Sequence, residues 1–159
     1  MNKRHPVSSP PLPDRRDSVG YLTNWAARLL AKAMDERLGQ LGLASGQLPV
    51  FFALAGGAEM TQRDLAKLAA IEQPTMAATL ARMERDGLVT RRPSPHDGRS
   101  ALVALSVQAM QLVPEVVAAV TEINERAFAG LSKADAAALR TALRTMICTL
   151  DPGAETGSS

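Results

Sequence analysis

The chain contains few of the residues that disulfides, metal sites and histidine-based catalysis require. Its 159 residues include one cysteine, Cys148, and two histidines, His5 and His96. A single cysteine excludes a disulfide within the chain, and this set is too small for a zinc site built by one chain. No nucleophile–base pair, paired carboxylate site or phosphate loop is visible, so we expect neither an enzyme nor a bound metal ion or cofactor.

Aromatic residues and long apolar stretches are also scarce. Aromatic residues make up 3% of the chain, too few for a row of rings that stacks single-stranded bases. No apolar stretch reaches the roughly 18 residues needed to cross a bilayer. The basic N-terminal residues lack the apolar segment of a secretory signal. We therefore expect a cytoplasmic protein that does not associate with membranes.

The remaining composition is that of a globular, mainly helical domain. Hydrophobic residues make up 46% and charged residues 21%, and alanine is frequent whereas β-branched runs are rare. Residues 1–17 hold four of the ten prolines and few large apolar residues, which predicts a flexible arm. We expect a single domain over residues 18–150 and a polar tail over 151–159.

The middle of this domain, residues 43–105, predicts three short helices followed by a two-stranded ribbon. Ser45 is the expected cap of the first helix. Thr61 with Asp64 forms a capping-box-like start for the second helix, and Leu68 is one of its expected inward residues.

The second and third of these helices form a helix-turn-helix, to which the ribbon adds a wing. The third helix begins beside Pro74, a preferred residue of a first turn, and ends before Gly87. Such a helix fits the major groove of DNA, where its N-terminal residues meet the base edges. The candidate DNA contacts of the two helices are Thr61, Gln62, Arg63, Gln73, Pro74, Thr75, Ala78 and Arg82.

The ribbon provides a second set of candidate DNA contacts, because arginine suits a narrow, electronegative minor groove. Asp97 is the expected brace that orients their guanidinium groups. The formal net charge of the chain is only +2, and the segment 87–105 holds all of this excess. Charge thus indicates a local DNA contact on the wing. Its candidate residues are Arg91, Arg92, His96 and Arg99.

Five short stretches of this region carry a resemblance to a known family. They are MTQRDLA at 60–66, QPTM at 73–76, RMERDGLV at 82–89, DGRS at 97–100 and VALS at 103–106. These stretches resemble the MarR family of bacterial winged-helix transcription regulators, and the likeness extends over about residues 18–150. The DxR of the wing together with RMERDGLV is its most specific part.

The resemblance implies a mainly α-helical fold with a small sheet, in which a winged helix at 43–105 is joined to dimerisation helices at 18–41 and 106–150. It implies a homodimer on a palindromic operator, and a repressor that a small ligand, aromatic or phenolic for many relatives, releases from DNA. Gln73, Thr75 and Ala78 are implied to face the major groove. Many relatives carry a polar or basic pair in place of Ala77 and Ala78, so we expect weaker base readout here.

The long apolar stripes of the outer helices independently favour a twofold dimer, whose symmetry matches that of a palindrome. A monomeric helical bundle is the alternative. Candidate residues of a ligand pocket are Trp25, Arg28, Phe51 and Phe52, for which ordinary core packing is the alternative.

Two further functional alternatives remain open. Cys148 is a candidate redox sensor, although its position beside Ile147 in an apolar stripe favours inert packing. A winged helix used for protein contacts is the other alternative. It predicts that the exposed face of the helix starting near Pro74 is apolar.

Overall fold

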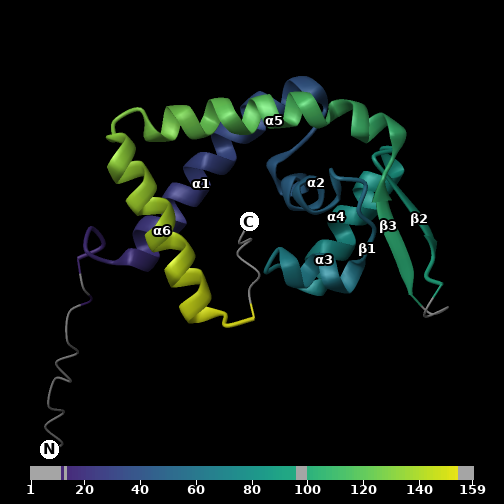
Figure 1. Ribbon diagram of the computed structural model, residues 1–159, viewed down its shortest axis with the longest axis horizontal. Coiled ribbons are helices and arrows are strands. Elements are labelled where there is room, and N and C mark those ends of the chain that lie inside the picture. Colours follow the sequence, from purple (N-terminus) through teal and green to yellow (C-terminus); the bar gives the residue numbers. More distant parts are fainter. Residues whose placement is uncertain (1–11, 13, 96–99, 154–159) are drawn as a thin grey trace, which may run out of the picture.

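A winged helix-turn-helix lobe and a scaffold of long helices make up the computed structural model (Figure 1). The structure describes residues 12, 14–95 and 100–153. Most of the predicted N-terminal arm and of the predicted polar tail therefore lies outside the described residues, as do residues 96–99 of the wing. The mainly helical fold with a small antiparallel sheet confirms the predicted fold class.

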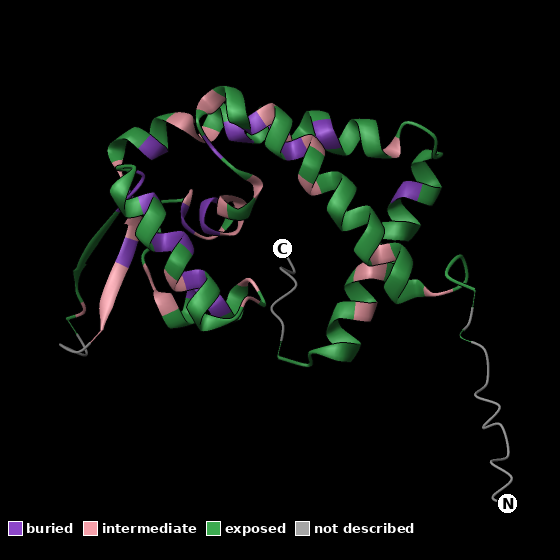
Figure 2. Ribbon diagram, turned by 180° about the vertical axis from the view of Figure 1, so that it is seen from behind, coloured by how far each residue is buried: buried purple, intermediate pink, exposed green. Residues whose placement is uncertain are grey.

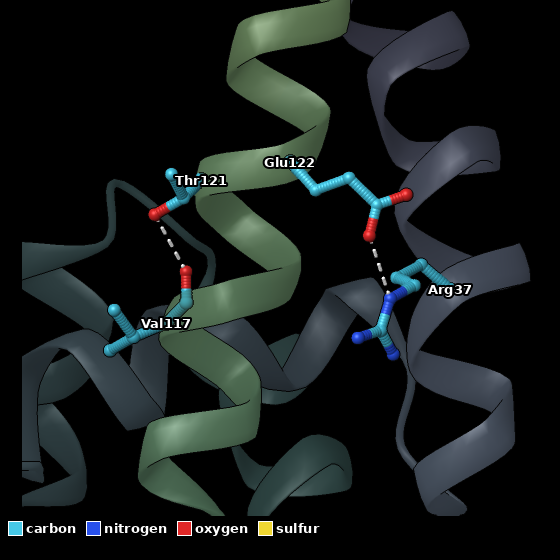
Figure 3. Close-up of polar contacts among 4 residues, drawn as sticks. All are labelled: Arg37, Val117, Thr121 and Glu122. Carbon is cyan, nitrogen blue, oxygen red and sulfur yellow. Dashed lines mark hydrogen bonds and ion pairs between the residues drawn. The ribbon is translucent and has the colours of Figure 1, made fainter.

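Three long helices form the scaffold: α1 (Val19–Leu38), α5 (Val107–Phe128) and α6 (Lys133–Leu150). α5 runs from the sheet to α6, and α1 packs against it (Figure 1). Arg37 Nε on α1 lies 3.0 Å from Glu122 Oε2 on α5 (Figure 3). The same figure shows Thr121 Oγ1 donating to the Val117 carbonyl within α5. The Arg37–Glu122 ion pair joins two of the three scaffold helices, α1 and α5.

Serine caps fix the start of the three scaffold helices. Ser18 Oγ accepts from the Tyr21 N–H at 3.3 Å, Ser106 Oγ from the Ala109 N–H at 3.1 Å, and Ser132 Oγ from the Asp135 N–H at 3.1 Å. Each bond satisfies an amide that has no partner within its helix. Each scaffold helix therefore begins directly after a serine.

The lobe contains the remaining elements. They are the 3-10 turns η1 (Gly39–Leu41) and η2 (Ser45–Gln47), helices α2 (Leu48–Leu54), α3 (Gln62–Leu68) and α4 (Gln73–Arg85), and strands β1 (Met60–Thr61), β2 (Val89–Pro93) and β3 (Ala101–Leu105). The strands form one antiparallel sheet in the order β1-β3-β2. β1, which the sequence did not predict, pairs Thr61 with Leu102.

The hydrophobic core fills the lobe and continues into the contact between α1 and α5 (Figure 2). Its largest fully buried side chains are Leu38, Leu54, Leu65, Met76, Leu80, Met83, Ile123, Val50 and Val103. Much of α1 and α6 is exposed instead, and α6 buries only Ala136. None of the helices in the described part of the chain is long and apolar enough to span a bilayer.

Two local expectations for the lobe are wrong. Ser45 does not cap a helix: it is the first residue of η2, and its N–H donates to Asp35 Oδ1 at 2.6 Å. Because a 3-10 turn precedes α2, that helix begins without a side-chain cap. Leu68 is exposed rather than inward, since Leu65 and Ala66 occupy the side of α3 that meets the core.

Candidate nucleic-acid interface

A tight connection sets the angle between α3 and α4. Thr61 Oγ1 accepts from the Asp64 N–H at 3.2 Å and donates to Asp64 Oδ2 at 2.7 Å, so the predicted cap of α3 is confirmed. At its other end, the Ile71 N–H donates to the Ala66 carbonyl at 2.9 Å, and Ala70 adopts a φ of 50°. These contacts stop α3 and let α4 start at once, as a helix-turn-helix requires.

α4 divides sharply into a buried and an exposed face. Met76, Leu80 and Met83, which are spaced by three or four residues, are buried together with Thr79. All five predicted DNA contacts on α4 lie on the exposed side: Gln73, Pro74, Thr75, Ala78 and Arg82. This face is polar rather than apolar, which argues against a winged helix specialised for protein contacts. Ala77 is half-buried, so Ala78 alone of the alanine pair is fully presented.

The remaining helix-turn-helix candidates lie at the start of α3. Arg63 is exposed, whereas Thr61 and Gln62 are half-buried. Within residues 12, 14–95 and 100–153, neither Arg63 nor Arg82 forms an ion pair. Their charges are therefore not neutralised by a neighbouring carboxylate and are available to phosphate oxygens.

The wing arginines have carboxylate partners that the sequence analysis missed. Arg91 Nε lies 3.0 Å from Glu84 Oε2 near the end of α4. Arg92 forms two bonds to Glu59, with Nε 2.7 Å from Oε1 and Nη2 on Oε2. The hydrogen bond from Arg92 holds the pKa of Glu59 below its ordinary value and raises the pKa of Arg92. No local signal identifies Glu59, which is 33 residues away in sequence.

The ribbon stays paired up to its tip. The Ser94 N–H donates to the Ser100 carbonyl at 2.9 Å, and Pro93 pairs with Ala101. The candidates His96, Asp97 and Arg99 lie outside the described residues. Within the described part of the chain, no group of three or more histidine, cysteine, aspartate or glutamate side chains is arranged to hold a metal ion.

The predicted ligand-pocket residues occupy different environments. Phe51 is buried in the core, whereas Phe52 beside it is 69% exposed. Trp25 is partly exposed on α1, where its ring meets that of Tyr21 edge-on at 6.0 Å, and Arg28 is exposed. The pocket role of these four residues stays a prediction.

A cavity of about 730 Å³ lies between α3 and the C-terminal end of α6. Its lining includes Met60, Lys67, Leu68, Arg144, Ile147 and Leu150, and none of the four predicted pocket residues. Cys148, also on α6, is exposed in the single chain rather than packed in its core. The inert packing expected for this cysteine stays a prediction.

Comparisons with known proteins agree with this arrangement. Residues 41–100 match the MarR family. The uncharacterized HTH-type transcriptional regulator YwoH of Bacillus subtilis is 33% identical over 112 residues, which cover 70% of this chain and 81% of that protein. The HTH-type transcriptional repressor NicR of Pseudomonas putida is 26% identical over 151 residues, covering 92% of this chain and 96% of NicR.

A solved structure shares the fold over most of the chain. A cysteine-to-serine mutant of E. coli MarR, crystallised in complex with operator DNA, superposes with a TM-score of 0.75 at 22% identity, covering 81% of this chain and 93% of that chain. The family match includes the helix-turn-helix and strand β2. The chain belongs to the MarR family of DNA-binding transcriptional regulators.

Proposed function

We propose that the protein is a repressor that binds a palindromic operator in double-stranded DNA as a homodimer and leaves it when a small ligand binds. The observation that carries this proposal is the exposed, polar start of α4, flanked by the arginines of the wing. The similarity to the repressor NicR supports the direction of regulation. Such a protein acts on the chromosome, in the bacterial cytoplasm.

The geometry supports a division of labour among the DNA contacts. Gln73 and Thr75, in the first turn of α4, are suited to base edges in the major groove, where glutamine pairs with adenine. Ala78 offers only a methyl contact. Arg82 and Arg63 are suited to phosphates, together with the amides at the start of α3, around Thr61 and Gln62. Arg91, Arg92, His96 and Arg99 then read the minor groove or backbone, with Asp97 as a brace.

The exposed apolar face of the scaffold supports the homodimer. Leu22, Leu29 and Leu30 on α1, and Ile147 and Leu150 on α6, are all at least 40% exposed in the single chain. A soluble protein rarely leaves so many large apolar side chains exposed without a partner. We assign the dimer contacts to exposed apolar side chains such as these, on the helices at 18–41 and 106–150, and the DNA contacts to the lobe at 43–105.

Release by a ligand requires that the ligand bind more tightly to the DNA-incompetent arrangement of the two lobes than to the competent one. The cavity between α3 and α6 lies where the lobe meets the scaffold, so its occupant would alter the position of α3. Trp25, Arg28, Phe51 and Phe52 remain candidate ligand contacts on α1 and α2. An effector is expected to lower operator affinity without unfolding the protein.

The decisive experiment begins with selection of duplexes by the protein from a randomised library. Enrichment of a palindrome is expected, and enrichment of no sequence would contradict sequence-specific binding. Arg91→Ala, Arg92→Ala and Arg99→Ala should then weaken binding and flatten its salt dependence, by about one unit of log–log slope per lost phosphate contact.

Two further variants, one of them a control, separate the roles of the side chains. Gln73→Ala should change the preferred sequence more than the overall affinity, since it removes a base contact rather than a charge. Lys133→Ala removes one positive charge at the start of α6, away from α4 and the wing (Figure 1). Its salt slope should match that of the wild type. An unchanged slope in the three wing variants would contradict the assignment of those arginines.

A further inference from the structure

Two carboxylates hold the wing arginines from two different elements of the lobe. Glu84 projects from the last turn of α4, and Glu59 immediately precedes β1 at the far edge of the sheet. We propose that Glu59 and Glu84 are positioning residues, which hold Arg92 and Arg91 for the operator and lower the affinity for other DNA. This inference rests on the proposed DNA-binding function.

The Arg92–Glu59 pair spans the whole width of the sheet. Arg92 on β2 pairs with Leu102 of β3, which pairs in turn with Thr61 of β1. Glu59 thus reaches across the central strand, and two nitrogens of one guanidinium meet the two oxygens of one carboxylate. Such two-bond pairs fix the plane of the guanidinium as well as its position. The pair therefore orients Arg92 relative to both outer strands.

The Arg91–Glu84 pair joins the wing to the proposed recognition helix. Successive residues of a strand point to opposite faces, so Arg91 and Arg92 leave β2 on different sides. Arg91 is the less exposed of the two, at 28% against 51% of its side chain. Its bond to Glu84 links β2 directly to α4. The angle between the wing and the recognition helix is therefore constrained by this contact.

Holding the arginines in place has opposite consequences for the operator and for other DNA. A guanidinium has five N–H donors, so an arginine held by a carboxylate keeps donors for DNA and loses less side-chain entropy on binding. The smaller entropy loss favours binding to the operator, whose shape fits the fixed positions of the arginines. Any DNA, in contrast, is repelled by the nearby carboxylates, which weakens the salt-dependent attraction that dominates non-specific binding. The pairs therefore raise selectivity rather than affinity for all DNA.

The test compares two duplexes: one enriched by the wild-type protein from a randomised library, and a scrambled duplex of the same length and base composition. Glu59→Gln should weaken binding to the enriched duplex by about fivefold, the loss of roughly one charge-assisted bond. It should strengthen binding to the scrambled duplex by about twofold at low salt, since a negative charge is lost. Glu84→Gln should act in the same directions.

Arg92→Lys tests the same contact without changing the charge. Lysine keeps the positive charge but lacks the planar fork, so binding to the enriched duplex should fall while binding to the scrambled duplex stays unchanged. If Glu59 acts through Arg92, the double variant Glu59→Gln/Arg92→Lys should lose no more on the enriched duplex than the worse single variant. Arg92→Lys also keeps the proposal testable if Glu59→Gln fails to fold.

Glu115→Gln is the matched control, since it removes one carboxylate from the exposed surface of α5 and should leave the selectivity unchanged. A parallel loss on both duplexes for Glu59→Gln would show a merely structural role and overturn the proposal. A parallel gain would show that the carboxylates only repel DNA, and additive losses in the double variant would separate Glu59 from Arg92. Either result overturns it too. Failure to enrich any duplex would refute the proposed function instead.

Discussion

Two arginines of the wing, Arg91 and Arg92, form ion pairs in the folded chain. In sequence, Arg91 and Arg92 belong to a segment with a positive excess. In the structure each meets a carboxylate from outside that segment, Glu84 or Glu59. These pairs are partly exposed, and exposed ion pairs contribute little to stability. Their influence should therefore be visible in DNA selectivity more than in stability.

The pH dependence of stability gives a prediction for Glu59. The hydrogen bond from Arg92 lowers the pKa of Glu59 in the folded protein below its ordinary value of 4.5. The contribution of the ion pair is therefore complete above that ordinary pKa and is lost as the pH falls through the lower folded value. Glu59→Gln should lower the melting temperature slightly near neutral pH, and the difference from the wild type should vanish in acid.

Melting curves followed by circular dichroism, from neutral pH down into acid, check the Glu59 prediction. Glu115→Gln, which removes a carboxylate without an ion pair in the described part of the chain, supplies the reference profile. A difference between Glu59→Gln and the wild type that grows as the pH falls would contradict the assigned sign.

At the scale of elements, the junction between the wing and α5 depends on one serine. Ser106 Oγ accepts from the Ala109 N–H at 3.1 Å and donates to the Gly87 carbonyl at 2.7 Å, and its N–H donates to the Leu88 carbonyl at 2.9 Å. Ser106 thus caps α5 and also fastens it to the segment that follows α4. The same residue connects the scaffold to the DNA-binding lobe.

Ser106→Ala should lower the free energy of unfolding by about 1–2 kcal/mol, because it removes a helix cap and leaves the Gly87 carbonyl without this donor. Ser132 provides the comparison. Within the described residues its hydroxyl bonds only to Asp135, through the backbone N–H and Oδ2, at the start of α6. Urea unfolding should show a smaller loss for Ser132→Ala than for Ser106→Ala. Equal losses would mean that the Gly87 bond contributes nothing.

At the scale of the whole molecule, the distribution of burial indicates what is missing from a single chain. The lobe has a continuous core, whereas most of α1 and α6 is exposed (Figure 2). The exposed residues of these two helices include large apolar ones such as Leu29 and Leu150. A second copy that covers these helices would bury them and would also place two copies of α4 on one DNA duplex. Dimerisation and operator binding should therefore fail together.

Leu29→Glu places a charge on the exposed apolar face of α1, where Leu29 is 57% exposed. We expect this variant to sediment as a monomer at concentrations at which the wild type is a dimer, and to lose affinity for the enriched duplex. Val107→Glu is the control, since Val107 is 79% exposed but lies at the opposite end of α5 from α6. A monomeric wild type, or a dimeric Leu29→Glu, would contradict the proposed interface.

The sequence by itself was sufficient for features that depend on neighbours along the chain. Helix caps such as Ser106 and Ser132, the buried stripe of Met76, Leu80 and Met83, and the polar exposed face of α4 follow from spacings of three or four residues. The resemblance of the helix-turn-helix and wing to the MarR family depended on the same local stretches. The family and the fold class were therefore predictable from the sequence alone.

The tertiary structure alone decided features that depend on segments distant in sequence. β1 is a strand only because Met60 and Thr61 pair with β3, and Leu68 is exposed because its neighbours fill the space on the core side of α3. Likewise, no spacing rule connects Glu59 to Arg92. Local pattern constrains which side of an element is apolar, but only the packed chain determines which charges meet. Here the packing pairs Arg91 with Glu84 and Arg92 with Glu59, so two arginines of the wing are held by carboxylates.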